Sequence, residues 1–141
     1  MRYVLDNSVA MRWLLPSQKS ADQDYAEAVL RSMLDATALV PQLWHLEAAN
    51  VLLTAEQCGE LTTAATDSFM VELINLPIET DHLTSSQAFG QTLSLARTYR
   101  LSSYDAAYLE LAIRSKLPLA TLDKRLLKAA GKAGVTLYLA S

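Results

Sequence analysis

The sequence predicts an α/β protein built on a buried parallel sheet. Short apolar runs alternate along the chain with longer stretches in which apolar residues recur at helical spacing. Each short run is almost continuously apolar, which is typical of a strand that helices cover on both faces. A hydrophobic fraction of 51% in 141 residues, with four Gly and four Pro, indicates a compact, helix-rich chain. We therefore expect one domain over residues 1–141.

Five apolar runs are the predicted strands. They are Tyr3–Leu5, Ala38–Val40, Pro77–Thr80, Leu119–Thr121 and Val135–Leu139. Parallel neighbours need long connections, and the segments between most of these runs are long enough to hold helices. The alternation of strands and helices thus favours a sheet in the middle of the domain with helices on both sides.

Six segments between or after these runs have helical spacing. They are Asp22–Ala36, Leu43–Gln57, Thr63–Leu76, Ser85–Tyr99, Tyr104–Lys116 and Lys124–Lys132. Gly59 is well placed to end the second helix in the left-handed conformation that glycine tolerates. Ser103 is a candidate cap for the fifth helix, since a serine hydroxyl can accept a hydrogen bond from a free N–H of the first turn.

Composition restricts where such a protein works. The single cysteine, Cys58, excludes an internal disulfide and fits a reducing compartment. Asp6 and Arg12 interrupt the apolar stretch that a signal peptide would need. No run approaches the roughly 20 apolar residues of a membrane span. We expect a cytoplasmic protein.

Two acids directly follow predicted strands. Asp6 comes after the first strand in "RYVLDNSV", and Asp123 follows the fourth in "PLATLDKRL". Ligands of open parallel sheets bind beyond the carboxyl ends of the strands, where these two carboxylates are expected to lie. Thr121 lies on the same side as Asp123 by two-residue alternation. Asn7 and Ser8 follow Asp6 without a spacer.

Two further acids belong to predicted helices. Glu47 lies among apolar neighbours in "LWHLEAANVLL", and Asn50, three residues on, shares its face and could orient it by a hydrogen bond. Asp105 falls in the first turn of its helix, where a carboxylate also suits the helix dipole. Acids are seldom placed inside an apolar helical segment, so Glu47 is the hardest of the four to explain structurally.

Each of the other acids has a structural alternative. Asp6 could begin a turn or cap a helix, Asp105 could be an N-terminal helix charge, and Asp123 could cap the last helix. If the four instead converge, they repel one another unless a cation neutralises them. Mg²⁺ or Mn²⁺ prefers oxygen ligands and can activate water for attack on a phosphodiester. No glycine-rich phosphate loop is present, and His45 and His82 are interpreted as surface or packing residues.

At these residues the chain resembles PIN-domain proteins, and more narrowly toxins of the VapC type. The resemblance rests on "VLDNSVAMRWLLP", on Pro41, Glu47, Asn50, Val51 and Leu52, on "SSYDAAYLELA" and on "ATLDKRLLKAAGKAGV", in that order. It implies a three-layer α/β/α fold with a five-stranded parallel sheet in the order 3-2-1-4-5. It also maps the family's acids onto Asp6, Glu47, Asp105 and Asp123, with Asn7 or Ser8, and Thr121, at the family's small polar positions beside them.

The resemblance implies a metal-dependent endoribonuclease that leaves 5′-phosphate and 3′-hydroxyl ends. It further implies a homodimer and inhibition by a VapB-type antitoxin. Many relatives carry another acid shortly after the fourth, whereas Lys124, Arg125 and Leu126 follow Asp123 here. We therefore expect one tight Mg²⁺ and at most one weak, substrate-dependent second ion. The alternative is a catalytically silent PIN fold that binds RNA or a protein.

Charge is unevenly distributed along the chain. The formal net charge is −3, but residues 32–96 contain no Lys or Arg and carry a net charge of −8. We expect an acidic rim there, with Glu56 and Glu60, to bind the antitoxin. The candidates for holding the RNA backbone are Arg12, Lys124 and Arg125, and Lys128 and Lys132 extend the basic series along the last helix.

Overall fold

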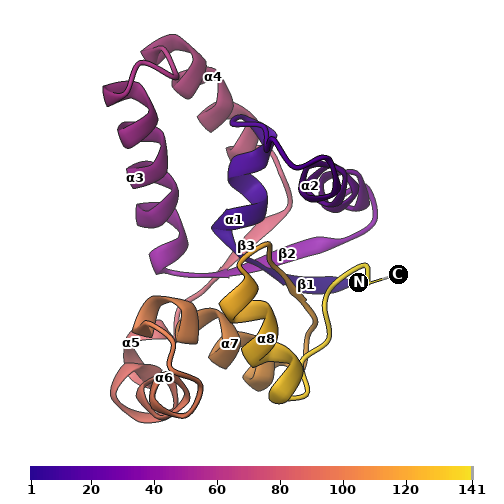
Figure 1. Ribbon diagram of the computed structural model, residues 1–141, viewed down its shortest axis with the longest axis vertical. Helices are drawn as coiled ribbons and strands as arrows, with labels where there is room; N and C mark the ends of the chain where they lie inside the picture. Colours follow the sequence, from indigo (N-terminus) through magenta and orange to yellow (C-terminus); the bar gives the residue numbers. More distant parts are fainter. Residues whose placement is uncertain (141) are drawn as a thin grey trace.

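A parallel sheet lies between two groups of helices (Figure 1). The computed structural model describes residues 1–140. Within this range the sheet has four strands in the order β3-β2-β1-β4, and every pair is parallel. The strands are β1 (Arg2–Leu5), β2 (Thr37–Pro41), β3 (Ile78–Asp81) and β4 (Leu119–Ala120). The predicted fold class and the predicted order of the first four strands are confirmed.

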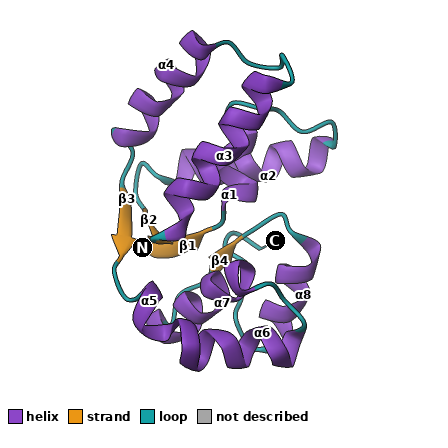
Figure 2. Cartoon of the chain, turned by 90° about the vertical axis from the view of Figure 1, so that its left-hand side faces the viewer, coloured by secondary structure: helices purple, strands orange, loops and turns teal. Residues whose placement is uncertain are grey.

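The helices form the two outer layers, as Figures 1 and 2 show from perpendicular directions. On one side of the sheet lie α1 (Asn7–Ala10), the 3-10 turn η1 (Met11–Trp13), α2 (Ser20–Ser32), α3 (Leu43–Gln57) and α4 (Thr63–Ile74). On the other side lie α5 (Thr84–Gln87), the π-helical turn η2 (Ala88–Thr92), α6 (Leu93–Tyr99), α7 (Ser103–Ser115) and α8 (Lys124–Lys132). The three-layer arrangement follows from covering both faces of an apolar sheet.

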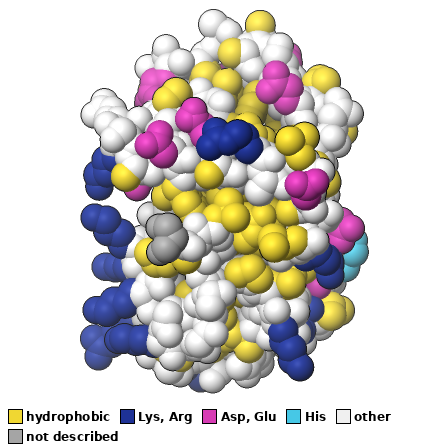
Figure 3. Space-filling model, turned by 90° about the vertical axis from the view of Figure 1, so that its right-hand side faces the viewer, with side chains coloured by type: hydrophobic (Ala, Val, Ile, Leu, Met, Phe, Trp, Pro, Cys, Tyr) yellow, Lys and Arg dark blue, Asp and Glu magenta, His cyan; other side chains and the backbone are white. Residues whose placement is uncertain are grey.

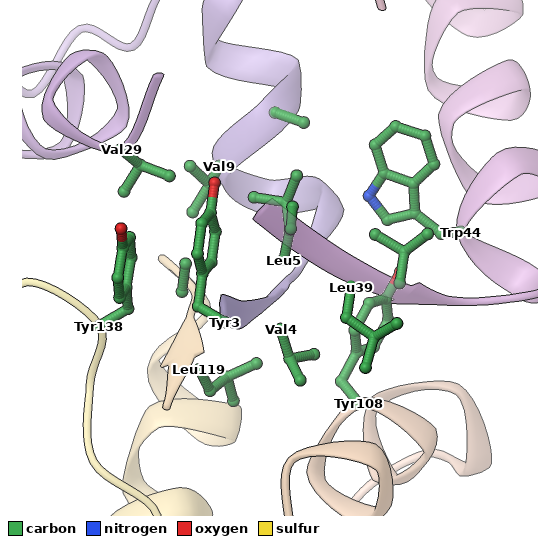
Figure 4. Packing of buried hydrophobic residues seen from close by; sticks show 14 of the residues in the cluster. Tyr3, Val4, Leu5, Val9, Val29, Leu39, Trp44, Tyr108, Leu119 and Tyr138 are labelled. Carbon is green, nitrogen blue, oxygen red and sulfur yellow. The ribbon is translucent and has the colours of Figure 1, made fainter. Parts of the chain in front are cut away.

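Strand β1 is the centre of the core. Tyr3, Val4 and Leu5 are fully buried, because helices cover both faces on which their side chains alternate. Figure 4 shows Leu5 on the side of Val9 in α1 and Val4 on the opposite side. Burial of this strand on both faces fixes its register, and with it the position of the residue that follows it.

The predicted fifth strand, Val135–Leu139, is wrong for the described residues. Beside β4 the chain makes a single parallel bridge, between Leu119 and Leu137. Strand β4 is two residues long, so it offers no further ladder, and Leu139 turns away with a φ of 56°. Tyr138 also stacks on Tyr3, with ring centroids 3.9 Å apart, so side-chain packing helps to hold this segment (Figure 4).

The predicted helix Ser85–Tyr99 is broken into α5, η2 and α6. Gly90 has a φ of −106° and a ψ of −106°, which lies outside the helical region. The apolar spacing continues through the break, and this continuity explains why the sequence pattern gives one helix. Leu95 in α6 is buried, whereas Phe89 beside Gly90 is 94% exposed.

Helix ends agree with local chemistry. Gly59 follows α3 with a φ of 78°, as the sequence predicts for a left-handed terminator. The cap of α7 is Ser102 and not Ser103: its hydroxyl accepts a hydrogen bond from the Asp105 N–H at 3.1 Å. Within residues 1–140, none of the helices combines the length and the apolar character needed to cross a bilayer.

Candidate functional site

Asp6 lies at the carboxyl end of β1, beside the end of β4. Its backbone N–H donates to the Ala120 carbonyl at 3.0 Å, so the two strands end together. The residue is only 6% exposed. Its Oδ2 atom accepts hydrogen bonds from the hydroxyls of Ser8, at 2.6 Å, and Thr121, at 2.8 Å. These two bonds hold the carboxylate in one orientation.

The two hydroxyls are themselves held by the chain that leaves β4. The Leu122 N–H donates to Ser8 Oγ at 2.9 Å, and the Asp123 N–H donates to Thr121 Oγ1 at 3.0 Å. A hydroxyl has one proton to donate, and in both residues the geometry directs it to Asp6. Ser8 and Thr121 therefore connect the end of β1 to the segment that carries Asp123.

Glu47 projects from α3 and is held from two other elements. The Tyr108 hydroxyl of α7 donates to Glu47 Oε1 at 2.5 Å, and Asn7 Nδ2 approaches the same oxygen at 3.3 Å. Asn7 Nδ2 also donates to the Trp44 carbonyl at 2.9 Å, which ties α1 to α3. Asn7 Oδ1 is buried and has no hydrogen-bond partner among the described residues. Glu47 is thus oriented by residues distant from it in sequence.

Asp105 and Asp123 lie at the N-terminal ends of α7 and α8. Asp105 is half-buried in the first turn of α7. Asp123 is the N-cap of α8, and its Oδ1 atom accepts from the N–H groups of Arg125 at 2.9 Å and Leu126 at 3.1 Å. The capping interpretation of Asp123 is therefore correct, and Asp123 also belongs with Asp6, Glu47 and Asp105 to one acidic group.

The charges of the four acids affect one another. Burial raises the pKa of Asp6 to about 6, and the charges of Glu47 and Asp123 raise it as well, while the two hydroxyl hydrogen bonds oppose the rise. Burial also raises the pKa of Asp105 to about 6, with further contributions from Asp123 and Asp6. The pKa of Glu47 rises through burial and the charge of Asp105, against the bonds from Tyr108 and Asn7. Carboxylates from four separate segments of the chain are therefore close enough for their charges to act on one another.

The donor set suits a hard divalent cation. In Asp6, Glu47 and Asp123 the hydrogen bonds found within residues 1–140 all go to one carboxylate oxygen, Oδ2, Oε1 and Oδ1 respectively. The second oxygen of each remains for another ligand. In the same range, no three Asp, Glu, His or Cys side chains form a ready-made cage. Mg²⁺ does not require one, because it keeps several waters and typically binds one or two carboxylates directly.

The expected role of Asn50 is not seen. Asn50 is exposed, and the hydrogen bonds to Glu47 come from Tyr108 and Asn7. A three-residue spacing places Asn50 and Glu47 near each other along α3, but Glu47 turns toward the sheet edge, where α7 and α1 provide donors. Among the RNA-binding candidates, Arg125 is close enough to Asp105 to lower its pKa, Lys124 is exposed, and Arg12 is partly buried in η1.

Tyr108 is the site residue that the sequence analysis missed. It is fully buried, and burial together with the charges of Asp6 and Glu47 raises its pKa, which keeps its hydroxyl protonated as a donor. The sequence contains one signal that could have pointed to Tyr108: it lies three residues after Asp105 on the same helix, a spacing that places both residues on one face. An aromatic residue in an apolar helix otherwise indicates core packing, and Tyr108 has that role too (Figure 4).

The family model for the PIN domain matches residues 3–132. This chain belongs to the PIN domain family. PIN domains are generally nucleases, and these nucleases typically use divalent metal ions. No relative among the curated proteins matches this PIN domain.

Two solved structures share the fold of this PIN domain. The crystal structure of PAE2754 from Pyrobaculum aerophilum matches with a TM-score of 0.64 and 24% identity, over 92% of this chain and 79% of that one. The crystal structure of FitAcB from Neisseria gonorrhoeae matches with a TM-score of 0.59 and 19% identity, over 98% of this chain and 96% of that one. At these identities the likeness concerns the fold.

Proposed function

We propose that this PIN domain is a metal-dependent endoribonuclease and the toxin of a type II toxin–antitoxin pair. As a single domain in the cytoplasm, it would hydrolyse RNA phosphodiesters with Mg²⁺ or Mn²⁺. The proposal is supported by four carboxylates, Asp6, Glu47, Asp105 and Asp123, that are close enough for their charges to act on one another. Within the described residues, none of them forms an ion pair with a cationic side chain. A divalent cation would relieve this repulsion.

Asp6, Glu47, Asp105 and Asp123 are the residues that would hold the metal. When bound, such an ion lowers the pKa of a water and stabilises charge on the phosphate oxygens. Hydrolysis joins the water oxygen to phosphorus and breaks the bond to the 3′ oxygen, which leaves a 5′-phosphate and a 3′-hydroxyl. Ser8 and Thr121 orient Asp6, and Asn7 and Tyr108 orient Glu47, so the carboxylates need little rearrangement on binding.

Cleavage of RNA by the pure protein tests the proposal. Structured RNA incubated with protein and Mg²⁺ or Mn²⁺ should be cut, and EDTA should stop the reaction. The double variant Asp6→Asn, Asp105→Asn should be inactive while its circular dichroism spectrum is unchanged. Cleavage that survives in this variant would point to a contaminating nuclease and remove the support for this site. Sequencing of the cut ends would test the expected 5′-phosphate and 3′-hydroxyl.

The second candidate is a PIN domain that binds RNA or a protein without cutting. The absence of a three-acid cage within residues 1–140 is the observation that favours it. Binding of the same RNA in Mg²⁺ with no product over hours would support this alternative. Metal-dependent products that disappear with EDTA would exclude it.

We also propose a VapB-type antitoxin as partner, docked in the groove between α3 and α4. This groove has a volume of about 320 Å³ and is lined mainly by apolar residues: Trp44, His45, Ala48, Ala49, Met70, Leu73, Ile74, Leu76 and Ile78. Besides Glu47, the two helices and their connection carry the acids Glu56, Glu60, Asp67 and Glu72 and no Lys or Arg. An apolar helix with Arg or Lys at its margins would complement this surface.

A charge reversal tests the antitoxin site. Glu56→Lys with Glu60→Lys should weaken binding of a basic, amphipathic antitoxin helix, and unchanged affinity would contradict the proposal. The remaining partner is a second copy of the chain, since Leu46 on α3 is 78% exposed and Phe89 in η2 is 94% exposed. Native mass spectrometry of the isolated protein should show a homodimer, and a monomer at micromolar concentration would contradict this expectation.

A further inference from the structure

A basic hollow lies between α6 and α8, beside the acidic group. It has a volume of about 520 Å³ and is lined by Thr98, Tyr99, Arg100, Arg125, Lys128, Ala129 and Lys132. Four of these residues are cationic and none is acidic. Figure 3 shows several Lys and Arg side chains following one another along one edge of the molecule. A concave surface with this charge suits an extended anion.

Ion pairs within the described residues do not account for the four cations of the hollow. Within residues 1–140 the basic members of the ion pairs are Arg2 and Arg114, so Arg100, Arg125, Lys128 and Lys132 form no ion pair there. All four are exposed. Their charges are therefore free to contact an anionic ligand in the hollow.

Helix α8 spaces three of these cations along one face. Arg125, Lys128 and Lys132 are separated by three and four residues, which places them on the same side of the helix. At a rise of 1.5 Å per residue, the series extends for about 10 Å along the helix. The length of this series exceeds that of a single phosphate group and fits a short stretch of a nucleic-acid strand. Tyr99 adds an aromatic ring on which a base can stack.

Arg125 connects the hollow to the candidate catalytic centre. It is two residues after Asp123 in the first turn of α8, and it also lines the hollow. Its distance from Asp105 is short enough for its charge to act on that carboxylate. A nucleic-acid strand that leaves the acidic group past Arg125 would therefore run along α8 toward Lys132.

Arg100 closes the hollow from the opposite side and holds an unusual backbone conformation. It ends α6 in the left-handed region, with a φ of 55°. Glycine adopts this conformation at a lower cost than arginine. The side chain at this position is the guanidinium of Arg100, which lines the hollow together with Arg125, Lys128 and Lys132.

We propose that this hollow is a binding site for single-stranded RNA, in which Arg100, Arg125, Lys128 and Lys132 contact phosphates next to the scissile bond. The proposal rests on the proposed nuclease function for its substrate but concerns a separate surface. It assigns binding roles to Arg100, Lys128 and Lys132, and it gives the strand a direction from the acidic group along α8.

The matched control is Lys116. It ends α7 just as Arg100 ends α6: it is an exposed cation in the left-handed region, with a φ of 56°, and it lies away from the hollow. Arg100→Gly and Lys116→Gly therefore remove the same charge and the same kind of backbone strain. Both variants should fold, with melting temperatures equal to each other within a few degrees.

RNA binding in EDTA tests the proposal without cleavage. Fluorescence anisotropy with a labelled 12-nucleotide single-stranded RNA, measured over a series of salt concentrations, gives the affinity and its salt dependence. Arg100→Gly should weaken binding several-fold at low salt and reduce the slope of log K against log salt by about 0.7. Lys128→Gln with Lys132→Gln should reduce the slope by about 1.4, and Lys116→Gly should match the wild type.

Two results would overturn the inference. Equal affinities for Arg100→Gly, Lys116→Gly and the wild type would show that the hollow does not bind RNA, even if metal-dependent cleavage is intact. Displacement of the RNA by polyglutamate of equal charge at equal concentration would reassign the hollow to an acidic protein. Conversely, if no cleavage is found but Arg100→Gly still weakens RNA binding, the result supports the binding site in the hollow and contradicts the nuclease proposal.

Discussion

Two groups of acids lie at the same edge of the sheet and have opposite surroundings. Asp81 is the last residue of β3, and Arg114 of α7 binds both of its carboxylate oxygens, at 3.0 and 2.8 Å. Arg114 also binds the buried Glu110, at 2.7 Å. These bonds lower the pKa of Asp81 below its usual value. At Asp6, by contrast, the neighbours are hydroxyls and other acids, and the pKa is raised to about 6.

The difference separates a structural charge from a candidate functional one. Helix α7 takes part in both groups, with Asp105 and Tyr108 near its start and Glu110 and Arg114 near its end. Arg114 thus forms ion pairs with the acids that hold α7 to β3, whereas within residues 1–140 no Lys or Arg forms an ion pair with the four acids that we propose bind a metal. Substitutions in the two groups should have opposite consequences.

The largest expected effect is on RNA cleavage. Asp6→Asn should lower the rate of metal-dependent cleavage by about 100-fold or more, because it removes one charged ligand from the site. Asp81→Asn should leave the rate nearly unchanged, since it acts only on the contact between α7 and β3. The initial rate with a labelled RNA measures both. Equal losses of cleavage rate in the two variants would contradict the division between a functional Asp6 and a structural Asp81.

The stability of the metal-free protein should change in opposite directions. Asp6→Asn should raise the free energy of unfolding by about 1 to 3 kcal/mol, because it removes a buried charge while its amide oxygen can still accept from Ser8 and Thr121. Asp81→Asn should lower it by about 1 to 3 kcal/mol through the weakened bonds to Arg114. Urea denaturation in EDTA at pH 7.5 measures both. Destabilisation by Asp6→Asn would favour a purely structural role for Asp6.

The fold could be predicted from sequence where local signals agreed. The bounds predicted for α3 and α8 are those observed, because Gly59 and Asp123 mark helix ends unambiguously. Periodicity alone did not define two features, the break in the predicted helix at Gly90 and the length of the predicted strand beside β4. Both depend on tertiary packing. For the candidate site, strand-end positions pointed to Asp6 and Asp123, whereas the bond from Tyr108 to Glu47 joins residues of different helices and leaves no local pattern.

The pH dependence gives a finer comparison. Because the pKa of Asp6 is about 6 in the folded protein and 3.8 ordinarily, the folded state binds the proton more readily. Its carboxylate therefore lowers stability progressively as pH rises from about 4 to about 6. The pKa of Asp81 is lowered, so its contribution is present above its ordinary pKa and is lost as pH falls through the folded value.

Urea denaturation in EDTA at several pH values measures these contributions. The stability gained by Asp6→Asn should grow between pH 4 and 6 and remain constant above that range. The stability lost by Asp81→Asn should shrink as pH falls below 4. A gain from Asp6→Asn that is the same at pH 4 and pH 7 would show that its charge is not the cause.

The smallest expected effect concerns the orientation of Glu47. Tyr108→Phe keeps the buried ring and removes the hydroxyl that donates to Glu47, so cleavage should fall by about 10-fold. Tyr104→Phe, on the same helix and 64% exposed, should leave the rate unchanged. Rates measured over a series of Mg²⁺ concentrations should show that Tyr108→Phe needs more metal. An unchanged metal requirement would contradict this positioning role.

Direct titration with Mn²⁺, followed by electron paramagnetic resonance of the free ion, is the closest test of the proposed metal centre. The wild-type protein and Asp81→Asn should bind one Mn²⁺ with the same affinity. Asp6→Asn and Asp105→Asn should each bind it at least about 10-fold more weakly, because each lacks a proposed ligand. Wild-type affinity in Asp6→Asn and Asp105→Asn, or no Mn²⁺ binding by the wild type, would contradict a shared cation at the end of β1.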